Sequence, residues 1–396
     1  MSAPTTTAVY PNESRERDHW IVSRRPGRAV VDVRRPHAYV IEHERSADGE
    51  IVDIATLFLT GRECPWRCLM CDLWKNTTEE RTPVGAIPAQ IDFALAELGG
   101  SRREEAHELA GEVIGSSGHA GSRRQIKLYN SGSFFDRAAV PFEDYEAIAR
   151  RVAGFERVIV ESHPALIGEA TLRFRDLLNE DAVRGASEGR QGLDCGGAPP
   201  LCERARSCGG PTKRQSAGAV QDAGATPGNP LLEVALGLET AHPDVLAKLN
   251  KRFTLDDFAR AAEFLRREGI ALRVFVLVRP PFMTEAEGLE WAVRSAEFAF
   301  DCGATVVSLI PTRFGNGALE ALATVGQFAP PHLASLEAAL EQGIALGRGR
   351  VFADLWDLEK FSNCPACYPA RRERLNQMNL RQCSGPGIEC ECDHAR

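Results

Sequence analysis

Three cysteines stand close together in the first quarter of the chain, and their spacing limits what the segment around them can form. Cys64, Cys68 and Cys71 follow a C-x3-C-x2-C pattern within the run ECPWRCLMCDLW, directly after an apolar segment at 54–60 that predicts a buried strand. A loop this short can turn three thiolates towards one point, and thiolates are the ligands that iron–sulfur clusters and zinc select. Three ligands with no fourth thiol nearby favour a cubane cluster that leaves one iron open.

Two other interpretations of the same cysteines stay open. They can form a zinc site that borrows a remote fourth ligand, or they can be structural thiols without a metal. The predicted strand before the loop and the repeating β/α units after it favour the cluster.

The composition is that of a soluble globular protein. Of its 396 residues, 43% are apolar and 26% are charged. The first 20 residues are polar and lack the apolar core of a secretory signal, and no stretch approaches the roughly 20 apolar residues of a membrane helix. We therefore expect a cytoplasmic protein with no membrane contact, whose 12 cysteines are reduced thiols or metal ligands.

The charge balance bears on nucleic-acid binding. A formal net charge of −8 argues against wholesale binding to nucleic acid, although not against a local basic patch. Runs of closely spaced arginines are most often solvated surface. The two candidate patches are Arg24, Arg25, Arg28, Arg34 and Arg35 in the N-terminal segment, and Arg371, Arg372, Arg374 and Arg381 near the C-terminus.

Short apolar runs alternate with amphipathic segments from residue 51 onwards. Two of the predicted helices begin with a capping box, at Thr254 with Asp257 and at Thr284 with Glu287. Six such units predict a parallel sheet with right-handed crossovers, closed into a partial (β/α)6 TIM-like barrel of the α/β class. The predicted strands are 54–59, 125–129, 157–161, 231–238, 271–278 and 305–310, and the predicted helices are 88–98, 142–153, 169–179, 255–267 and 285–300.

The chain divides into three predicted parts. Residues 1–50 form an irregular arm with a strand at 29–33 or 38–42, residues 51–315 form the core, and residues 316–396 form a C-terminal extension with a cysteine-rich tail. Within the core, 99–124 is predicted to be a loop with a short helix, and 185–230 a flexible insertion poor in large apolar residues. The insertion's Cys195, Cys202 and Cys208 are expected to be incidental surface thiols.

A second group of cysteines lies in the predicted tail. Cys364 and Cys367 form a C-x2-C pair, followed by Cys383, Cys390 and Cys392. This spacing is typical of a structural zinc site and can equally hold a second iron–sulfur cluster. Five cysteines exceed the four ligands that zinc needs, so one of them should be a spare. Unligated thiols are the remaining alternative.

The three-cysteine run with its preceding strand resembles the radical S-adenosylmethionine (SAM) superfamily. The resemblance implies a [4Fe-4S] cluster held by Cys64, Cys68 and Cys71, with SAM chelated to the open iron, and it implies the barrel of that type. Reductive cleavage of SAM would release a 5′-deoxyadenosyl radical that abstracts hydrogen from the substrate. A flavodoxin- or ferredoxin-like electron donor is the implied partner. Met70 departs from the family pattern, since many members carry an aromatic residue there.

The resemblance also implies where SAM binds. Ligands of parallel barrels lie at the carboxyl ends of the strands, so polar groups at strand ends are the candidates. A Ser-Gly-Ser turn occupies the place of a Gly-Gly-Glu-like motif that binds the methionine amino group in the family. Two acids at strand ends can accept hydrogen bonds from the ribose or from that amino group. An arginine at a strand end can pair with a carboxylate. These candidates are Ser131, Gly132, Ser133, Glu161, Glu239 and Arg279. No motif identifies a catalytic residue beyond them.

Four longer blocks narrow the resemblance. NSGSFFD, VIVESHP, GLETAHPDVLAKLNKRFT and VLVRPPFMTEAE resemble the radical SAM core of the elongator catalytic subunit and, more closely, the radical SAM subunit of archaeosine synthase. Those proteins act on tRNA, which implies a modified tRNA base as the substrate, tRNA as a partner and a lyase or transferase type of reaction. Two alternatives remain: a radical SAM enzyme for a small metabolite or peptide, and a zinc-stabilised binding protein without activity.

Overall fold

One eight-stranded sheet organises the protein, in a computed structural model that describes residues 9–108, 124–130, 132–188, 230–390 and 392. The strands lie in the sheet in the order in which they occur in the sequence. Strands β2 to β8 are parallel, and β1 pairs antiparallel with β2. The strands are β1 (Ala38–Arg45), β2 (Ile51–Leu59), β3 (Arg124–Asn130), β4 (Arg157–Ser162), β5 (Leu231–Glu239), β6 (Ala271–Val278), β7 (Val306–Pro311) and β8 (Arg350–Ala353).

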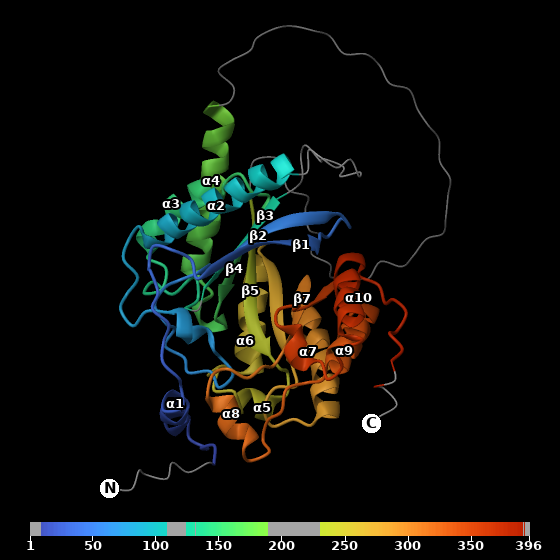
Figure 1. The fold of residues 1–396 in the computed structure, drawn as a ribbon. Helices are drawn as coiled ribbons and strands as arrows, with labels where there is room; N and C mark the ends of the chain where they lie inside the picture. Colours follow the sequence, from blue (N-terminus) through green and yellow to red (C-terminus); the bar gives the residue numbers. More distant parts are fainter. Residues whose placement is uncertain (1–8, 109–123, 131, 189–229, 391, 393–396) are drawn as a thin grey trace, which may run out of the picture.

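Helices cover the outer face of the sheet and one of its ends. Figure 1 shows α2, α3 and α4 on one side, α9 and α10 on the other, and α1, α5 and α8 gathered at one end of the strands. No helix in the described ranges is both long and apolar enough to cross a membrane. The helices are α1 (Ser14–Val22), α2 (Ala86–Glu108), α3 (Tyr145–Val152), α4 (Glu169–Glu188), α5 (Pro243–Lys248), α6 (Leu255–Arg267), α7 (Glu285–Asp301), α8 (Ala318–Ala323), α9 (Leu333–Ala345) and α10 (Tyr368–Arg381).

The predicted fold class is confirmed. The six predicted strands correspond to β2–β7, and both predicted capping boxes are present at the starts of α6 and α7. The sheet extends beyond the predicted core of 51–315 at both edges, because β1 lies in the predicted arm and β8 in the predicted extension. Of the segment 99–124, predicted to be a loop with a short helix, residues 99–108 continue α2. The predicted insertion lies outside the described residues except at its two ends, and so do Cys195, Cys202 and Cys208.

The two faces of the sheet differ in chemistry. Alternate residues such as Leu57 and Leu128 belong to the main apolar core, which the covering helices complete. Their neighbours Phe58, Lys127 and Tyr129 are absent from that core and point to the barrel interior. Because a strand exposes successive side chains on opposite faces, an apolar outer face and a mixed aromatic and charged inner face follow from the same strands.

A network of ion pairs crosses the interior of the barrel and ties β1 to the parallel strands. The guanidinium of Arg273 lies 2.8 Å from Glu44 on β1 and 2.7 Å from Glu233, and Glu233 also meets Arg157 at 3.0 Å. The ammonium of Lys127 also pairs with Glu44. Burial raises the pKa of Glu44, but Arg273 and Lys127 outweigh it and hold the pKa well below the usual range. The carboxylate therefore stays charged inside the barrel.

Side-chain amides from α10 and from the residue that follows it complete the outer edge of β8. Asn379 accepts a hydrogen bond from the Ala353 N–H (2.8 Å) and donates one to the Ala353 carbonyl (2.9 Å). Gln382 does the same at Val351, at 2.7 and 2.8 Å. Each amide thus reproduces the donor and acceptor that a neighbouring strand would supply, so the last strand needs no ninth partner.

Candidate metal and cofactor site

The cysteine loop leaves the carboxyl end of β2 and crosses the end of the barrel. Cys64, Cys68 and Cys71 are all half-buried free thiols. Burial first, and the negative charge of a Cys68 thiolate second, raise the pKa of Cys64 to about 12. The same two causes raise the pKa of Cys71, with both other cysteines contributing. The three sulfurs therefore interact, and a group that holds them as thiolates must bring positive charge.

The spacing of these sulfurs differs from that of a single-ion site. Among the residues that the structure describes, one group of His, Cys, Asp or Glu ligand atoms gathers within 4.8 Å, and it lies in the tail, not in this loop. A multi-iron cluster places several atoms between its thiolates and keeps them farther apart than one ion does. The three loop sulfurs are therefore not gathered for a single ion, and a multi-iron cluster on this loop stays a prediction.

Hydrogen bonds from distant residues hold the backbone of the loop. The Asn250 amide donates to the Arg67 carbonyl at 2.8 Å, and the Leu69 N–H donates to the Leu249 carbonyl at 2.9 Å. Asn316 donates to the carbonyls of Leu69 (2.8 Å) and Cys71 (3.3 Å). Peptide groups on both sides of Cys68 are thus fixed from outside the loop, which presets the direction of its thiol.

The N-terminal arm fastens the outer side of the same loop. Trp20 and Ile21 of α1 pack with Leu69 in a small apolar cluster. Arg25 meets the Glu63 carboxylate at 2.8 Å, and Arg28 pairs with its other oxygen. Within the arm predicted to be irregular, α1 and the residues up to Arg28 therefore form an ordered strap beside the cysteines.

Several arginines of the two predicted basic patches are engaged in contacts within the protein. Besides Arg25 and Arg28, the Arg24 guanidinium stacks 3.7 Å from the centre of the Trp20 ring. In the C-terminal group, Arg371 and Arg374 pair with Glu337, whereas Arg372 and Arg381 are exposed. The exposed members of the first group are Arg34 and Arg35.

A ring stack joins the cysteine loop to the end of β4. Trp66 and His163 lie parallel, with ring centres 3.7 Å apart. The Nε2 of His163 is 2.9 Å from the Lys251 carbonyl, and burial lowers its pKa to about 3, so the ring is neutral and Nε2 donates. His163 therefore connects three segments at the carboxyl end of the barrel.

The predicted Ser-Gly-Ser turn packs directly against the loop. A Cβ on Gly132 would stand 2.2 Å from the Arg62 carbonyl oxygen, so only glycine fits there. Ser133 has a φ of 68° and its hydroxyl accepts from the His163 N–H at 3.0 Å. Ser131 lies outside the described residues. The turn adjoins the cysteine loop, and its contact with a cofactor stays a prediction.

The two strand-end acids meet at the barrel end but differ in charge balance. Glu239 pairs with Lys251 at 2.5 Å, with both side chains 10% exposed. The Glu161 carbonyl accepts from the Phe134 N–H at 2.8 Å, but its carboxylate has no ion-pair or hydrogen-bond partner in the described part of the chain. Burial, reduced in part by Lys251 and reinforced by Glu239, raises the pKa of Glu161 to about 7. Glu161 is thus the acid that a cationic ligand would stabilise.

Arg279 is the predicted ligand residue that the structure engages elsewhere. Its guanidinium pairs with Glu285 at the start of α7 and donates to the Pro330 carbonyl at 2.8 Å. The carboxylate of Glu285 also accepts from the His332 N–H at 2.8 Å. Arg279 therefore secures the beginnings of α7 and α9, and pairing with a cofactor carboxylate, which stays a prediction, would require it to leave Glu285.

The tail brings four of its five cysteines together. The sulfurs of Cys364 and Cys390 are 3.7 Å apart, those of Cys367 and Cys392 are 3.8 Å apart, and all four lie within 4.8 Å. Cys383 is exposed and outside the group, as expected for the spare thiol. Arg374 donates to the Pro386 carbonyl at 2.7 Å and so holds the returning chain on α10.

Sequence reasoning missed the residues that hold the cysteine loop. Asn250, Lys251 and Asn316 follow no metal-ligand or catalytic spacing, and each acts across a large sequence separation. Their constraint is visible only in the folded backbone, where Asn250 and Arg252 both have a φ of 60°. Such left-handed residues mark a segment forced into place by its contacts.

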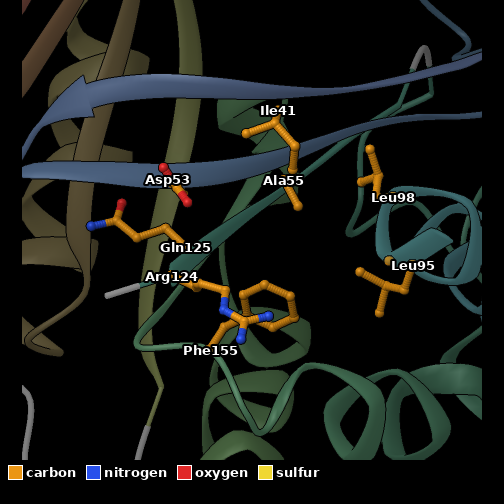
Figure 2. Close-up of a pocket in the computed structure, with 9 residues that line it drawn as sticks. Ile41, Asp53, Ala55, Leu95, Leu98, Arg124, Gln125 and Phe155 are labelled. Carbon is orange, nitrogen blue, oxygen red and sulfur yellow. The ribbon is translucent and has the colours of Figure 1, made fainter. Parts of the chain in front are cut away.

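One pocket lies away from this site, on the outer face of the sheet. Figure 2 shows it between α2 and the amino-terminal parts of β2 and β3. It brings no cysteine or histidine together and is distant from the carboxyl end where the candidate site lies. Its lining residues are Ile41, Asp53, Ala55, Leu95, Leu98, Gly99, Arg124, Gln125 and Phe155.

Comparison with known proteins confirms the resemblance to archaeosine synthase subunit beta. The Methanosarcina acetivorans protein of that name is 34% identical over 119 residues, 30% of this chain and 34% of that protein. The Thermococcus kodakarensis protein of the same name is 42% identical over 64 residues, 16% of this chain and 20% of that protein. An uncharacterised protein of Methanocaldococcus jannaschii is 23% identical over 390 residues, 92% of this chain and 87% of that protein. No family model matches.

Solved structures with distant similarity include Elp3 and HemN. Methanocaldococcus infernus Elp3 with an N-terminal deletion has a TM-score of 0.41 at 11% identity, over 71% of this chain and 58% of that one. Coproporphyrinogen III oxidase (HemN) from Escherichia coli, described as a radical SAM enzyme, has a TM-score of 0.37 at 12% identity, over 87% of this chain and 58% of that one. Similarity this low does not assign an activity.

The state of Glu161 predicts a pH-dependent effect on stability. Because its pKa rises from 4.5 in the unfolded chain to about 7 in the folded protein, the folded state binds the proton more tightly. Stability is therefore lost as pH increases from 4.5 to about 7. We expect Glu161→Gln to raise the urea midpoint at pH 8 and to leave it nearly unchanged at pH 4. The matched control is Glu297→Gln, on the exposed face of α7, which should change neither midpoint. An equal midpoint for Glu161→Gln and the parent protein at pH 8 would contradict the assigned burial.

Proposed function

We propose that the chain is a radical SAM enzyme with its cluster on the loop at the carboxyl end of the barrel. The observation that carries the proposal is the preset loop: three interacting thiols whose flanking peptide groups are fixed by Asn250, Leu249 and Asn316. A loop that is ordered in advance places its ligands without a further entropy cost. The relatives named archaeosine synthase subunit beta support the same class.

The residues have separate roles in this proposal. Cys64, Cys68 and Cys71 would hold the [4Fe-4S] cluster, which when bound with SAM supplies one electron and the 5′-deoxyadenosyl radical. Glu161 would accept from the amino group or ribose of SAM, since it is the acid without a partner. His163 and Trp66 keep the loop against β4 and exclude water from one side of the site. A flavodoxin- or ferredoxin-like protein would deliver the electron, in the cytoplasm.

Replacing one loop cysteine tests the enzyme class. Anaerobic reconstitution of the parent protein should give about four irons per loop site, and addition of dithionite and SAM should yield 5′-deoxyadenosine. Cys68→Ala should reduce SAM cleavage to background and leave the circular dichroism spectrum unchanged, because the loop backbone is held by other residues. Cys302→Ala, a half-buried thiol at the end of α7, is the matched control and should retain both iron and activity. SAM cleavage by Cys68→Ala would overturn the cluster assignment.

For the tail, we propose a structural zinc ion rather than a second cluster. Tetrahedral zinc with Zn–S bonds of about 2.3 Å holds its sulfurs about 3.8 Å apart. The observed pairs at 3.7 and 3.8 Å match that value, and a multi-iron cluster would need wider spacing. The ion would join the start of α10 to the residues that follow it.

Removal of one tail ligand tests the zinc proposal. Cys367→Ala should lose the zinc and lower the melting temperature, since the ion contributes folding free energy. Cys383→Ala, the exposed spare, should retain both the zinc and the melting temperature. Metal content by mass spectrometry with parallel calorimetry would measure both quantities. Iron in the tail of a variant that lacks all three loop cysteines would instead indicate an auxiliary cluster.

The proposed substrate is a modified tRNA base. Two relatives bear the name of an archaeosine synthase subunit, and Arg34 and Arg35 remain exposed beside the strap. A small metabolite or peptide is the alternative substrate, and a zinc-stabilised binding protein is the alternative outside enzymes. A protein with zinc in the tail but no iron in the loop would support the last of these.

Salt-dependent retention of tRNA separates the two kinds of substrate. The parent protein should bind tRNA at low salt and lose affinity steeply as salt rises, because phosphate contacts release counterions. Replacing Arg34 and Arg35 by serine should weaken binding and flatten the slope of affinity against salt. Replacing Arg294, a paired and exposed arginine on α7 outside both patches, by serine should leave the slope unchanged. Absence of tRNA binding at low salt would favour the small-molecule alternative.

A further inference from the structure

A short segment after α5 brackets the central cysteine of the loop. The Leu249 carbonyl accepts from the N–H of Leu69, at 2.9 Å, and the Asn250 amide donates to the carbonyl of Arg67, at 2.8 Å. The next residue, Lys251, is buried, with 8% of its surface exposed. Its carbonyl accepts from the Nε2 of His163 at 2.9 Å, so its main chain is fixed on the carbonyl side. Lys251 therefore has a defined position beside Cys68.

The ammonium of Lys251 lies beside Gly237 and Glu239, near the end of β5. It lies 2.5 Å from Glu239, at the end of β5. A β-bulge between Gly237 and Glu239 turns this acid, whose φ is 67°, towards the lysine. A Cβ on Gly237 would stand 2.4 Å from the Glu239 carboxylate and 2.5 Å from the lysine nitrogen. The absent side chain at Gly237 therefore leaves the space in which the two charges meet.

Both charges of this pair act on Cys68. Burial raises the pKa of the Cys68 thiol; the positive charge of Lys251 is the largest influence that lowers it, and Glu239 raises it again. Burial lowers the pKa of Lys251, but Glu239 outweighs it, so the ammonium keeps its proton. The pair is thus a permanent dipole whose positive end has the stronger effect at the sulfur, in surroundings where water screens little.

We propose that Lys251 is a positioning residue whose fixed charge, balanced by Glu239, sets the reduction potential of the cluster bound at Cys68. The inference rests on the proposed function, because it assumes a cluster on this loop. Reduction adds an electron to the cluster, and a nearby cation stabilises the more negative state. Lys251 then favours the reduced cluster, which is the state that must deliver an electron to SAM, and Glu239 limits the size of that effect.

Three variants distinguish an electrostatic role from a structural one. Lys251→Met removes the positive charge and keeps the length of the chain, Glu239→Gln removes the negative charge and keeps a hydrogen-bond acceptor, and the double variant removes both. The reduction potential of each reconstituted protein is measured by redox titration monitored by electron paramagnetic resonance, without SAM or substrate. We expect the first to lower the potential, the second to raise it, and the double variant to return towards the parent value.

The expected shift in reduction potential can be given a minimum size, and Lys248 supplies a matched control. A tenfold change in the ratio of reduced to oxidised cluster corresponds to about 59 mV for a one-electron couple, and we expect at least that change for each single variant. Lys248→Met, three residues away on the exposed surface of α5, should leave the potential unchanged, since solvent and salt screen its charge.

The outcomes separate this inference from the proposed function. If the parent protein takes up no iron, both fall together. If iron is bound and the single variants shift the potential in the same direction, or do not shift it, the inference fails and the proposed function stands. If Lys251→Met loses its iron, Glu239→Gln still decides, because an unchanged or lower potential in that variant overturns the electrostatic role.

Discussion

The structure depends on how the backbone of one short loop is held. The loop between β2 and Leu73 contains three cysteines and has little regular structure of its own, so its peptide groups need partners from elsewhere. Asn250, Leu249 and Asn316 supply them from segments that are more than 150 residues away in the sequence. The strap formed by α1 and Arg25 covers the other side. A three-cysteine motif becomes a candidate site only because residues that follow β2, β4, β5 and β7 meet at the carboxyl end of the barrel.

The barrel supports this arrangement through the different chemistry of its two faces. The outer face packs against helices through apolar side chains, as a parallel sheet requires. The inner face carries Arg273, Glu233, Glu44 and Lys127, whose mutual ion pairs occupy the interior near the amino ends of the strands. Buried ion pairs contribute little net stability compared with apolar packing, but an unpaired charge there would be costly. The network therefore favours one relative placement of β1 and the parallel strands.

The sequence predicted the elements that have a local pattern. Continuous apolar runs identified β2–β7, and hydroxyl–carboxylate spacing identified the caps of α6 and α7. Cysteine spacing identified both groups of thiols and predicted one spare cysteine in the tail, but it did not show that Cys383 is the spare. The sequence did not predict β8, because this strand is only four residues long. Its edge is completed by the side chains of Asn379 and Gln382, and no hydrophobic periodicity reveals such contacts. The sequence also did not predict a role for Lys251. Its ion pair with Glu239 depends on the space left at Gly237 and on the bulge before Glu239, and neither is visible in the sequence. For Arg279, the sequence predicted the position at the end of a strand correctly. It did not predict that the side chain forms an ion pair with Glu285.

The different sulfur spacing of the two thiol groups supports our proposal of two different metals in one chain. The direct measurement is anomalous X-ray diffraction from anaerobically grown crystals, recorded at the iron and zinc absorption edges. The account predicts an iron peak bounded by Cys64, Cys68 and Cys71, and a zinc peak among Cys364, Cys367, Cys390 and Cys392. A zinc peak at the loop with no iron peak there would contradict the central claim that this loop holds an iron–sulfur cluster.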